Sequence, residues 1–236
     1  MKFYRYQPIN KYTLSNLAQG KNWVANPFDF NDPFEFRMTE IYYTNSEGEL
    51  TYLDEKSMKA RILYKEKLGE IGVICYSSKE IDTLMYSHYS DHHMGMCLVF
   101  DVLPKNMISM RKVNYKDNLG NFHFSLNKDK LKDEIIRICT TKSTVWTYED
   151  EYRQIFTNKH FLADYPGKLT EIIFGCKTTK SDIELVISLL NSKVQEMEIS
   201  KTFISVNTFM LGKSTISCKE DGTFEVPQLW DGIHEA

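Results

Sequence analysis

The chain has 236 residues, 42% of them hydrophobic and 26% charged, with a formal net charge of −3. These proportions are typical of a globular protein that buries a sizeable core, and the net charge gives no general attraction to nucleic acid. The chain contains no run of about 18 or more apolar residues, so the sequence excludes a transmembrane helix.

The first residues, "MKFYRYQPIN", lack the apolar segment of a secretory signal, and Lys2 does not fit a myristoylation site. The five cysteines are far apart and form no C-x-x-C pair, which argues against a disulfide framework or a zinc ribbon. We therefore expect a cytoplasmic protein with no membrane partner.

In chain order, "KFYRYQ" predicts a strand, and Asn10 caps a helix that runs to about Ala18 and stops at Gly20. A short strand, "NWVAN", comes next. Residues 43–55 predict a hairpin or a surface loop, and residues 55–69 a charged helix.

The segment "PFDFNDPFEF" predicts a turn. Asn31 and Asp32 can bond to their own backbone, and Pro33 fixes the next φ angle. We expect Phe30 and Phe34 to anchor this loop on the core.

In the middle of the chain, "IGVICYSS" predicts a buried strand, and "LMYSHYSDHH" a helical turn or two that ends near His93. "GMCLVFDV" and "ISMRKVNY" predict neighbouring strands. Asn127 begins a helix whose apolar face carries Leu131, Ile135 and Ile138.

Towards the C-terminus, "STVWTYEDEYRQIF" predicts a turn that leads into a strand, and "LTEIIFG" a further strand. Residues 181–197 predict a helix with a capping box of Ser181 and Glu184. One stripe of this helix is apolar: Ile183, Val186, Ile187, Leu190, Val194 and Met197. "KTFISVNTFMLGKSTISC" predicts a closing hairpin.

Strands and helices alternate without a regular β-α-β rhythm, and no linker divides the chain. We predict one α+β domain over residues 1–236, with a mixed, largely antiparallel sheet flanked by helices.

The histidine-rich stretch "LMYSHYSDHHMGMCLVF" allows three interpretations. On a continuing helix, His88 and His92 would share one face, as zinc ligands require, but no third ligand has matching spacing. The histidines can instead hydrogen-bond at a helix end. In the third interpretation, His88 or His93 lines a cleft as a proton donor or a substrate-binding group. We expect no metal.

Glu149, Glu151 and Arg153 alternate, so on one strand their side chains would share a face. Arg153 could hold one glutamate ionised as a base or a hydroxyl-binding group, with Trp146 as a stacking surface. The alternative is an edge strand whose charged face is solvated. Arg5 has corresponding alternatives: it belongs to an amphipathic edge strand, or it binds an anionic group of the substrate.

Several of these segments, in this order, resemble the bacterial family of unknown function numbered 2971. They are "YRY", "FNDPFE", "LMYSHYSDHHMGMCLVF", "KSTVWTYEDEYR" and "EIIFG". In the histidine-rich segment the matching positions include Ser87, His88, Tyr89, His93 and Gly95, whereas His92 is not a family position.

The layout is also similar to that of ADP-ribosyltransferases, which carry an arginine or histidine on the first strand and a catalytic glutamate on a late strand. The resemblance implies that Arg5 binds phosphate and that Glu151, or Glu149, holds the nicotinamide ribose of NAD. It also implies a role as a toxin or an antiphage-defence effector.

We therefore expect a nucleotide-like substrate, with NAD-dependent ADP-ribosyl transfer or NAD cleavage as the specific reaction. The catalytic residues would be Glu151, Glu149 and His88, and the substrate would contact Arg5, Asn31, Tyr89, His93, Trp146 and Arg153. One alternative is a metal-independent nuclease that uses His88 and His93. The other is a non-enzymatic module that senses a nucleotide or binds a protein or nucleic-acid partner.

Overall fold

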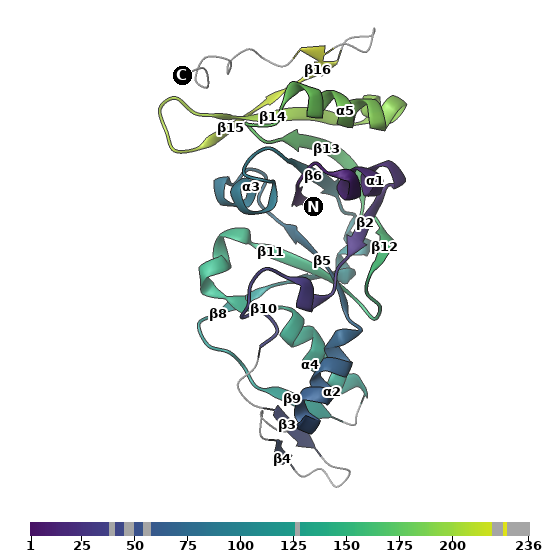
Figure 1. Ribbon diagram of the computed structural model, residues 1–236, viewed down its shortest axis with the longest axis vertical. Helices are drawn as coiled ribbons and strands as arrows, with labels where there is room; N and C mark the ends of the chain where they lie inside the picture. The colour runs from purple at the N-terminus through teal and green to yellow at the C-terminus, as the bar shows by residue number, and fades with distance from the viewer. Residues whose placement is uncertain (38–40, 45–49, 54–57, 126–127, 219–223, 226–236) are drawn as a thin grey trace. The chain divides into compact units, whose positions relative to one another are not determined.

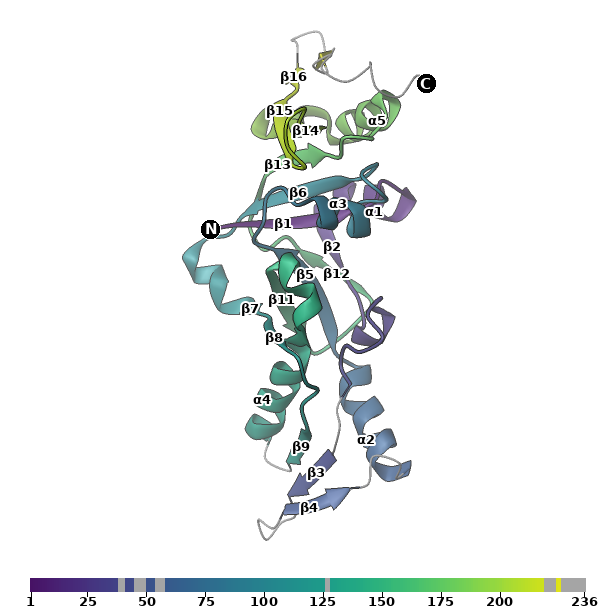
Figure 2. The same ribbon diagram turned by 90° about the vertical axis from the view of Figure 1, so that its left-hand side faces the viewer.

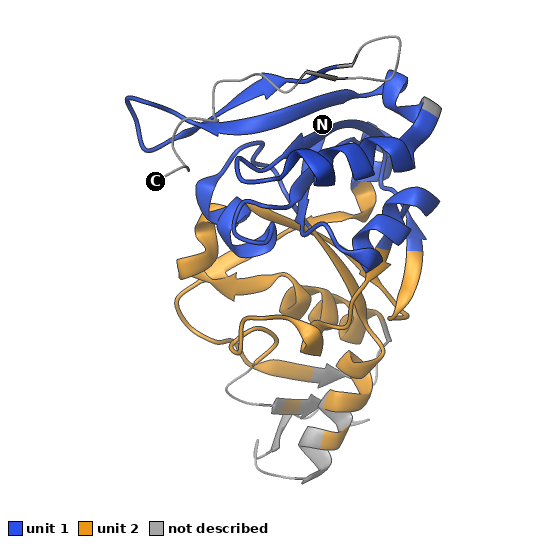
Figure 3. Cartoon of the chain, turned by 45° about the horizontal axis from the view of Figure 1, so that its top comes forward, with its two compact units in different colours: residues 1–22, 76–107, 163–236 blue, residues 23–75, 108–162 orange. Residues whose placement is uncertain are grey.

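In the computed structural model the chain forms two compact units, each built from separate stretches of sequence (Figure 3). Unit 1 comprises residues 1–22, 76–107 and 163–236, and unit 2 comprises residues 23–75 and 108–162. The structure describes residues 1–37, 41–44, 50–53, 58–125, 128–218 and 224–225. The prediction of a single domain over the whole chain stays a prediction.

Unit 1 is formed mainly by long strands and α-helices, which Figure 1 labels. Its strands are β1 (Lys2–Gln7), β6 (Met96–Asp101), β13 (Lys168–Phe174), β14 (Glu198–Ile204) and β15 (Leu211–Thr215), followed by the short β16 (Ser217–Cys218) and β17 (Phe224–Glu225). Its helices are α1 (Lys11–Gln19), α3 (Thr83–Tyr89) and α5 (Lys180–Leu190), with the 3-10 turn η4 (Asn191–Glu196). Helix α1 packs against α5, and α3 packs against β1.

Unit 2 combines shorter strands with two helices, and α4 lies beside β9 (Figure 2). The helices are α2 (Met58–Gly69) and α4 (Lys128–Cys139), and the 3-10 turns are η1 (Pro27–Asp29) and η3 (Thr144–Glu149). The strands are β3 (Ile41–Thr44), β4 (Leu50–Leu53), β7 (Met110–Lys112), β8 (Asn114–Lys116), β9 (Phe122–Ser125), β10 (Thr141–Ser143) and β11 (Glu151–Phe156). Four further elements have residues in both units: β2 (Lys21–Val24), β5 (Gly72–Ser77), η2 (Pro104–Ser109) and β12 (Phe161–Asp164).

The largest sheet has eight strands in the order β15-β14-β13-β6-β1-β5-β11-β7. Strand β1 pairs antiparallel with β6 along its whole length, and β6 pairs antiparallel with β13. The β13–β14 pair is parallel, whereas β14 and β15 form an antiparallel hairpin. The α+β class with a mixed, largely antiparallel sheet is therefore confirmed. In the described part of the chain, no helix is long and apolar enough to cross a membrane.

Several local predictions are also confirmed. Helix α1 begins after Asn10, whose side chain accepts the backbone N–H of Thr13 at 3.0 Å, and it ends at Gly20 with a left-handed φ of 66°. Strands β3 and β4 form the hairpin predicted for residues 43–55, although residues 45–49 and 54–57 lie outside the described residues. The cysteines whose side chains are described, Cys75, Cys97, Cys139 and Cys176, are free thiols.

The prediction that "GMCLVFDV" and "ISMRKVNY" are neighbouring strands is wrong. The second segment divides into β7 and β8, and β7 pairs with β11 while β8 pairs with β10. The division falls at Val113, whose backbone N–H donates to the carbonyl of Glu151 at 2.9 Å, and the next N–H, of Asn114, donates to Thr140 at 2.7 Å. Consecutive residues therefore bond to different partners, which ends the β7 ladder.

The cap predicted for the last helix is also wrong. The N-cap is Thr179, whose hydroxyl accepts the backbone N–H of Asp182 at 3.2 Å, so the helix already includes Ser181. It ends at Leu190 because Asn191 adopts a left-handed φ of 51°. The apolar stripe is confirmed where it faces the core, since Ile183, Val186 and Leu190 are buried.

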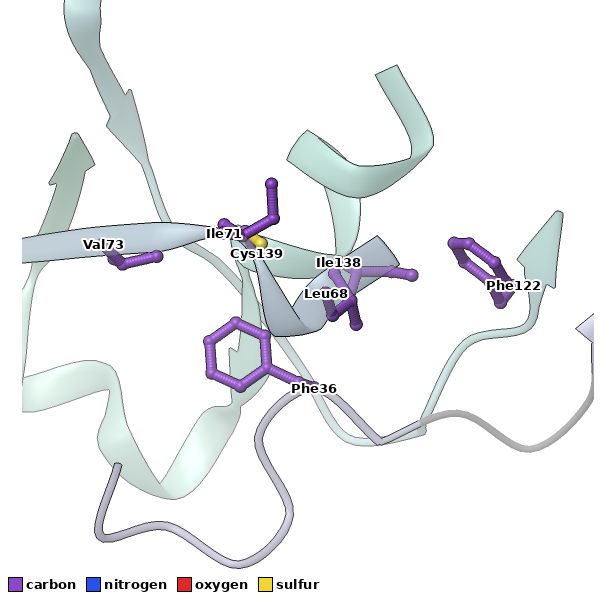
Figure 4. Close-up of a cluster of buried hydrophobic side chains, with 7 residues drawn as sticks. All are labelled: Phe36, Leu68, Ile71, Val73, Phe122, Ile138 and Cys139. Carbon is purple, nitrogen blue, oxygen red and sulfur yellow. The ribbon is translucent and has the colours of Figure 1, made fainter. Parts of the chain in front are cut away.

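A cluster of buried side chains from α2, β5, β9, α4 and two connecting segments forms the core of unit 2 (Figure 4). Its members are Phe36, Leu68, Ile71, Val73, Phe122, Ile138 and Cys139. Phe36, 4% exposed, anchors the "FNDPFEF" loop, whereas Phe34 is 59% exposed. The expected anchoring role of Phe34 is therefore wrong, while Phe30 does pack against the cluster and against the ring of Phe36.

Candidate functional site

Five charged side chains meet in the interior of unit 2. This buried ionic cluster consists of Glu35, Lys142, Glu149, Glu151 and Arg153, each 9% exposed or less. The Lys142 ammonium lies 3.0 Å from Glu35, 2.5 Å from Glu149 and 3.4 Å from Glu151. The Arg153 guanidinium lies 2.7 Å from both Glu35 and Glu151. Three carboxylates thus share two cations, which leaves a formal charge of −1.

The local backbone explains how these residues converge. Glu151 and Arg153 are two apart on β11, so their side chains leave the strand on the same side, as predicted. Glu149 is not on that strand, contrary to the prediction: it ends η3, and Asp150 reverses the chain with a left-handed φ of 41°. Glu35 follows an Asx turn in which Asp32 accepts the backbone N–H of Phe34 at 2.9 Å, as the turn chemistry of "FNDPF" predicted.

The charges hold one another ionised. Burial by itself would raise the pKa of Glu151, but the charges of Arg153 and Lys142 outweigh it and lower that pKa to about 2. Burial would likewise lower the pKa of Lys142, yet the three carboxylates raise it. The interpretation of a solvated edge strand is therefore wrong, because these side chains lie in the interior and pair with each other.

Arg153 has its donors directed at protein groups. It donates to Glu151 and Glu35 and to the carbonyl of Cys139 at 2.9 Å, and its guanidinium lies 5.5 Å from the rings of Phe30 and Phe36. A guanidinium that is 0% exposed and paired in this way has no open edge for a substrate phosphate. Arg153 therefore organises the interior in this structure.

A pocket of about 260 Å³ opens beside the buried ionic cluster, within unit 2. Lys142 is a member of the buried ionic cluster and also lines the pocket. The other cationic residues of its lining are Arg37, Lys116 and Arg137, and the acidic one is Asp117. Phe34, Phe36, Leu119 and Ile138 supply an apolar wall, and Asn118, Thr141 and Ser143 supply neutral polar groups. This combination suits a small molecule with a flat apolar part and an anionic part.

The cations of the pocket differ in how far they are already paired. Arg137 donates to Glu134 at 2.7 Å, and Lys142 serves the buried ionic cluster. Arg37 and Lys116 are exposed and make no ion pair within the described residues, although the Arg37 guanidinium lies 5.7 Å from the Phe34 ring. These two cations are the ones available to an incoming anion.

The predicted site residues of unit 1 lie on β1 and around α3. The α-helix ends at Tyr89, and Asp91, His92 and His93 follow with left-handed φ angles of 47°, 53° and 72°. The interpretation in which a continuing helix places His88 and His92 on one face, one of the three considered, is therefore wrong. Within the described residues, no group of three or more His, Cys, Asp or Glu side chains is placed to hold a metal ion.

The histidines differ in their surroundings. His88 is exposed and meets the Tyr89 ring edge-on at 6.3 Å. His93 stacks on the ring of Tyr86 at 6.1 Å, and burial, with help from Lys177 and His92, lowers its pKa. This lowered pKa keeps His93 neutral at pH 7, and its substrate-binding role stays a prediction.

The predicted residues thus fall into two groups. Arg5, His88, Tyr89 and His93 belong to unit 1, whereas Asn31, Trp146, Glu149, Glu151 and Arg153 belong to unit 2. Asn31 is exposed at the turn, and Trp146 lies 4.8 Å from the Lys142 ammonium, so it borders the buried ionic cluster. The single cleft that combines both groups stays a prediction.

Sequence reasoning missed Glu35 and the cationic lining of the pocket. Glu35 lies 118 positions from Arg153, so no periodicity links the two residues. Lys142 lies in the segment "KSTVWTYEDEYR", one of those on which the expected resemblance depends, but its side chain suggested no role. In unit 1 the buried Glu171, which bonds to Lys213 at 2.9 Å, was also missed.

The chain matches no protein-family model, no curated protein and no solved structure. The resemblance to the family of unknown function and to ADP-ribosyltransferases therefore stays a prediction.

Proposed function

We propose that unit 2 binds a small anionic, nucleotide-like molecule in its pocket. The observation that carries this proposal is the lining: four cationic side chains face one carboxylate, and Arg37 and Lys116 make no ion pair within the described residues. Unpaired cations beside an apolar wall are what a phosphate attached to a flat ring requires.

The volume supports a small ligand. Pockets for drug-sized molecules have about 300–1,000 Å³, so a cavity of about 260 Å³ suits one nucleotide better than a dinucleotide. The exposed Phe34 and Leu119 would contact the ring, and Arg37 and Lys116 would contact the phosphate. Lys142 would fix the end of the pocket because its three carboxylate partners hold it in place.

Binding without turnover is the form of this function that the geometry favours. The expected transferase chemistry requires Glu151 to touch the ribose of NAD, but Glu151 is 4% exposed and both of its oxygens accept bonds from Arg153. Release of nicotinamide from NAD that disappears in Glu151→Gln would overturn this choice and restore the transferase hypothesis.

Isothermal titration calorimetry with AMP, and with inorganic phosphate for comparison, tests the proposal. We expect AMP to bind, and Arg37→Ala and Lys116→Ala each to weaken it about tenfold, because each removes a charge-assisted hydrogen bond of about 1.5 kcal/mol. Lys132→Ala is the matched control, since Lys132 is an exposed lysine of α4 outside the pocket. Equal affinity in all four proteins, or no heat with AMP at millimolar concentration, would contradict it.

A further inference from the structure

Arg5, on strand β1 in the sheet of unit 1, has unusual surroundings for a charged side chain. On β1, Arg5 and Phe3 point to the same side, and their partners on β6 are Leu98 and Phe100. Phe3, Leu98 and Phe100 are each 1% exposed or less. A guanidinium therefore emerges from a strand among apolar side chains, which is an unusual position for a charge.

The Arg5 guanidinium lacks a counter-ion in the part of the chain that the structure describes. Arg5 takes part in no ion pair within the described residues, and its Nη1 is buried without a hydrogen-bond acceptor. Buried donors in native proteins nearly always have a partner, which is a protein group, an ordered water or a bound ligand. Tyr76, whose ring meets that of Phe3, accepts a bond from Asn22 at 3.0 Å, and no described protein group accepts a bond from Arg5 Nη1.

A second unpartnered donor lies on the same side of the sheet. The ring of Tyr165 lies 4.8 Å from that of Phe100, and the Tyr165 hydroxyl is buried without a hydrogen-bond partner among the described residues. Phe100 is the diagonal cross-strand neighbour of Arg5, so Arg5 and Tyr165 are both neighbours of the Phe100 side chain. Burial raises the pKa of Tyr165 to about 12, against a smaller opposing effect of Arg5, and the hydroxyl therefore keeps its proton at neutral pH.

We propose that Arg5 and Tyr165 form an oxyanion site in unit 1, which binds a carboxylate or phosphate group. Two donors without an acceptor require oxygen atoms, and a planar guanidinium binds such groups through two parallel N–H bonds. The site is carried by other residues than the unit 2 pocket and does not depend on the function proposed for that pocket. It gives Arg5 the anion-binding role predicted from the sequence without requiring a nucleotide or NAD.

Thermal unfolding in the presence of anions tests this site. The full chain carrying Arg37→Ala and Lys116→Ala serves as the starting protein, so that the cations of the unit 2 pocket do not contribute. We expect potassium phosphate or acetate to raise Tm above its value in potassium chloride of equal ionic strength, since an anion that binds the folded state stabilises it. The stronger of the two anions identifies the chemical class.

Tyr165→Phe, added to the starting protein, should weaken the apparent affinity for that anion at least tenfold. Without added anion it should leave Tm unchanged or higher, because a buried unpartnered hydroxyl is removed. Arg5→Met should abolish the response, and Tyr12→Phe, which alters an exposed tyrosine of α1, should preserve it. If the starting protein and Tyr165→Phe respond equally, or neither anion raises Tm, the two donors bind water and the proposal is overturned.

Discussion

Acidification of the buried ionic cluster provides the sharpest test of the architecture of unit 2. The pKa of Glu151 is about 2 in the folded chain, against an ordinary value of 4.5. Between these values the unfolded chain binds the proton more readily than the folded one, so the stability that Glu151 contributes is complete above about pH 5 and falls as pH falls. The difference corresponds to on the order of 3 kcal/mol in total, of which about 2 kcal/mol is lost by pH 3.

Urea unfolding of the wild type and of Glu151→Gln at pH 6 and pH 3 measures this contribution. At pH 6 we expect the variant to be less stable by about 3 kcal/mol, because an uncharged amide leaves Arg153 and Lys142 with fewer counter-charges. At pH 3 the gap between the two proteins should shrink by about 2 kcal/mol. Asp133→Asn, which changes an exposed carboxylate of α4, controls for general acid effects. A gap that stays constant with pH would refute the argument that Arg153 and Lys142 hold Glu151 ionised.

Three further pairs of substitutions, each a test variant and its matched control, probe other parts of the fold. Phe36→Ala should lower the free energy of unfolding in urea by about 3–5 kcal/mol, because it removes a buried ring from the core of unit 2. Phe34→Ala, at an exposed position, should lower it by less than about 1 kcal/mol. Equal losses would contradict the assignment of Phe36 as the anchor. In thermal unfolding, Thr179→Ala should lower stability by about 1 kcal/mol and Ser181→Ala by less, because Thr179 is the N-cap. A larger loss for Ser181→Ala than for Thr179→Ala would restore the cap predicted from the sequence. Gly95→Ala should lower the free energy of unfolding by about 1–3 kcal/mol, because the added Cβ would lie 2.4 Å from the carbonyl oxygen of Gln7. Gly69→Ala should be tolerated, because a Cβ at that position meets no atom within 4 Å. An unchanged Tm for Gly95→Ala would show that the contact with Gln7 relaxes.

The sequence by itself determined the elements that depend on neighbouring residues. Asn10 and Gly20 bound α1 because a cap and a left-handed stop act within one turn of the helix. The continuous apolar run of β5 predicts a buried strand, and the apolar stripe of α4 predicts which face of that helix is buried. Both predictions agree with the burial in the structure. The α+β class follows from the order of such elements.

The sequence also predicted that Glu151 and Arg153 share one face of a strand. It did not distinguish a charged face exposed to solvent from one buried in the interior. Alternation along a strand fixes which side chains share a side and is silent about what covers that side. Here Glu35, from a distant turn, and Lys142, from β10, lie over Glu151 and Arg153. Glu35 pairs with both Lys142 and Arg153, so the four charges form ion pairs in the interior.

Only the tertiary structure decided these partners, because long-range contacts are selected by the packing of whole elements rather than by any local spacing. The same holds for Phe36 over Phe34, for Val113 at the end of β7, and for the Tyr165 hydroxyl beside Phe100. Arg5 combines both levels: the sequence left open whether it belongs to an amphipathic edge strand or binds an anionic group. The fold then surrounded it with apolar side chains and left its guanidinium without a protein counter-ion among the described residues.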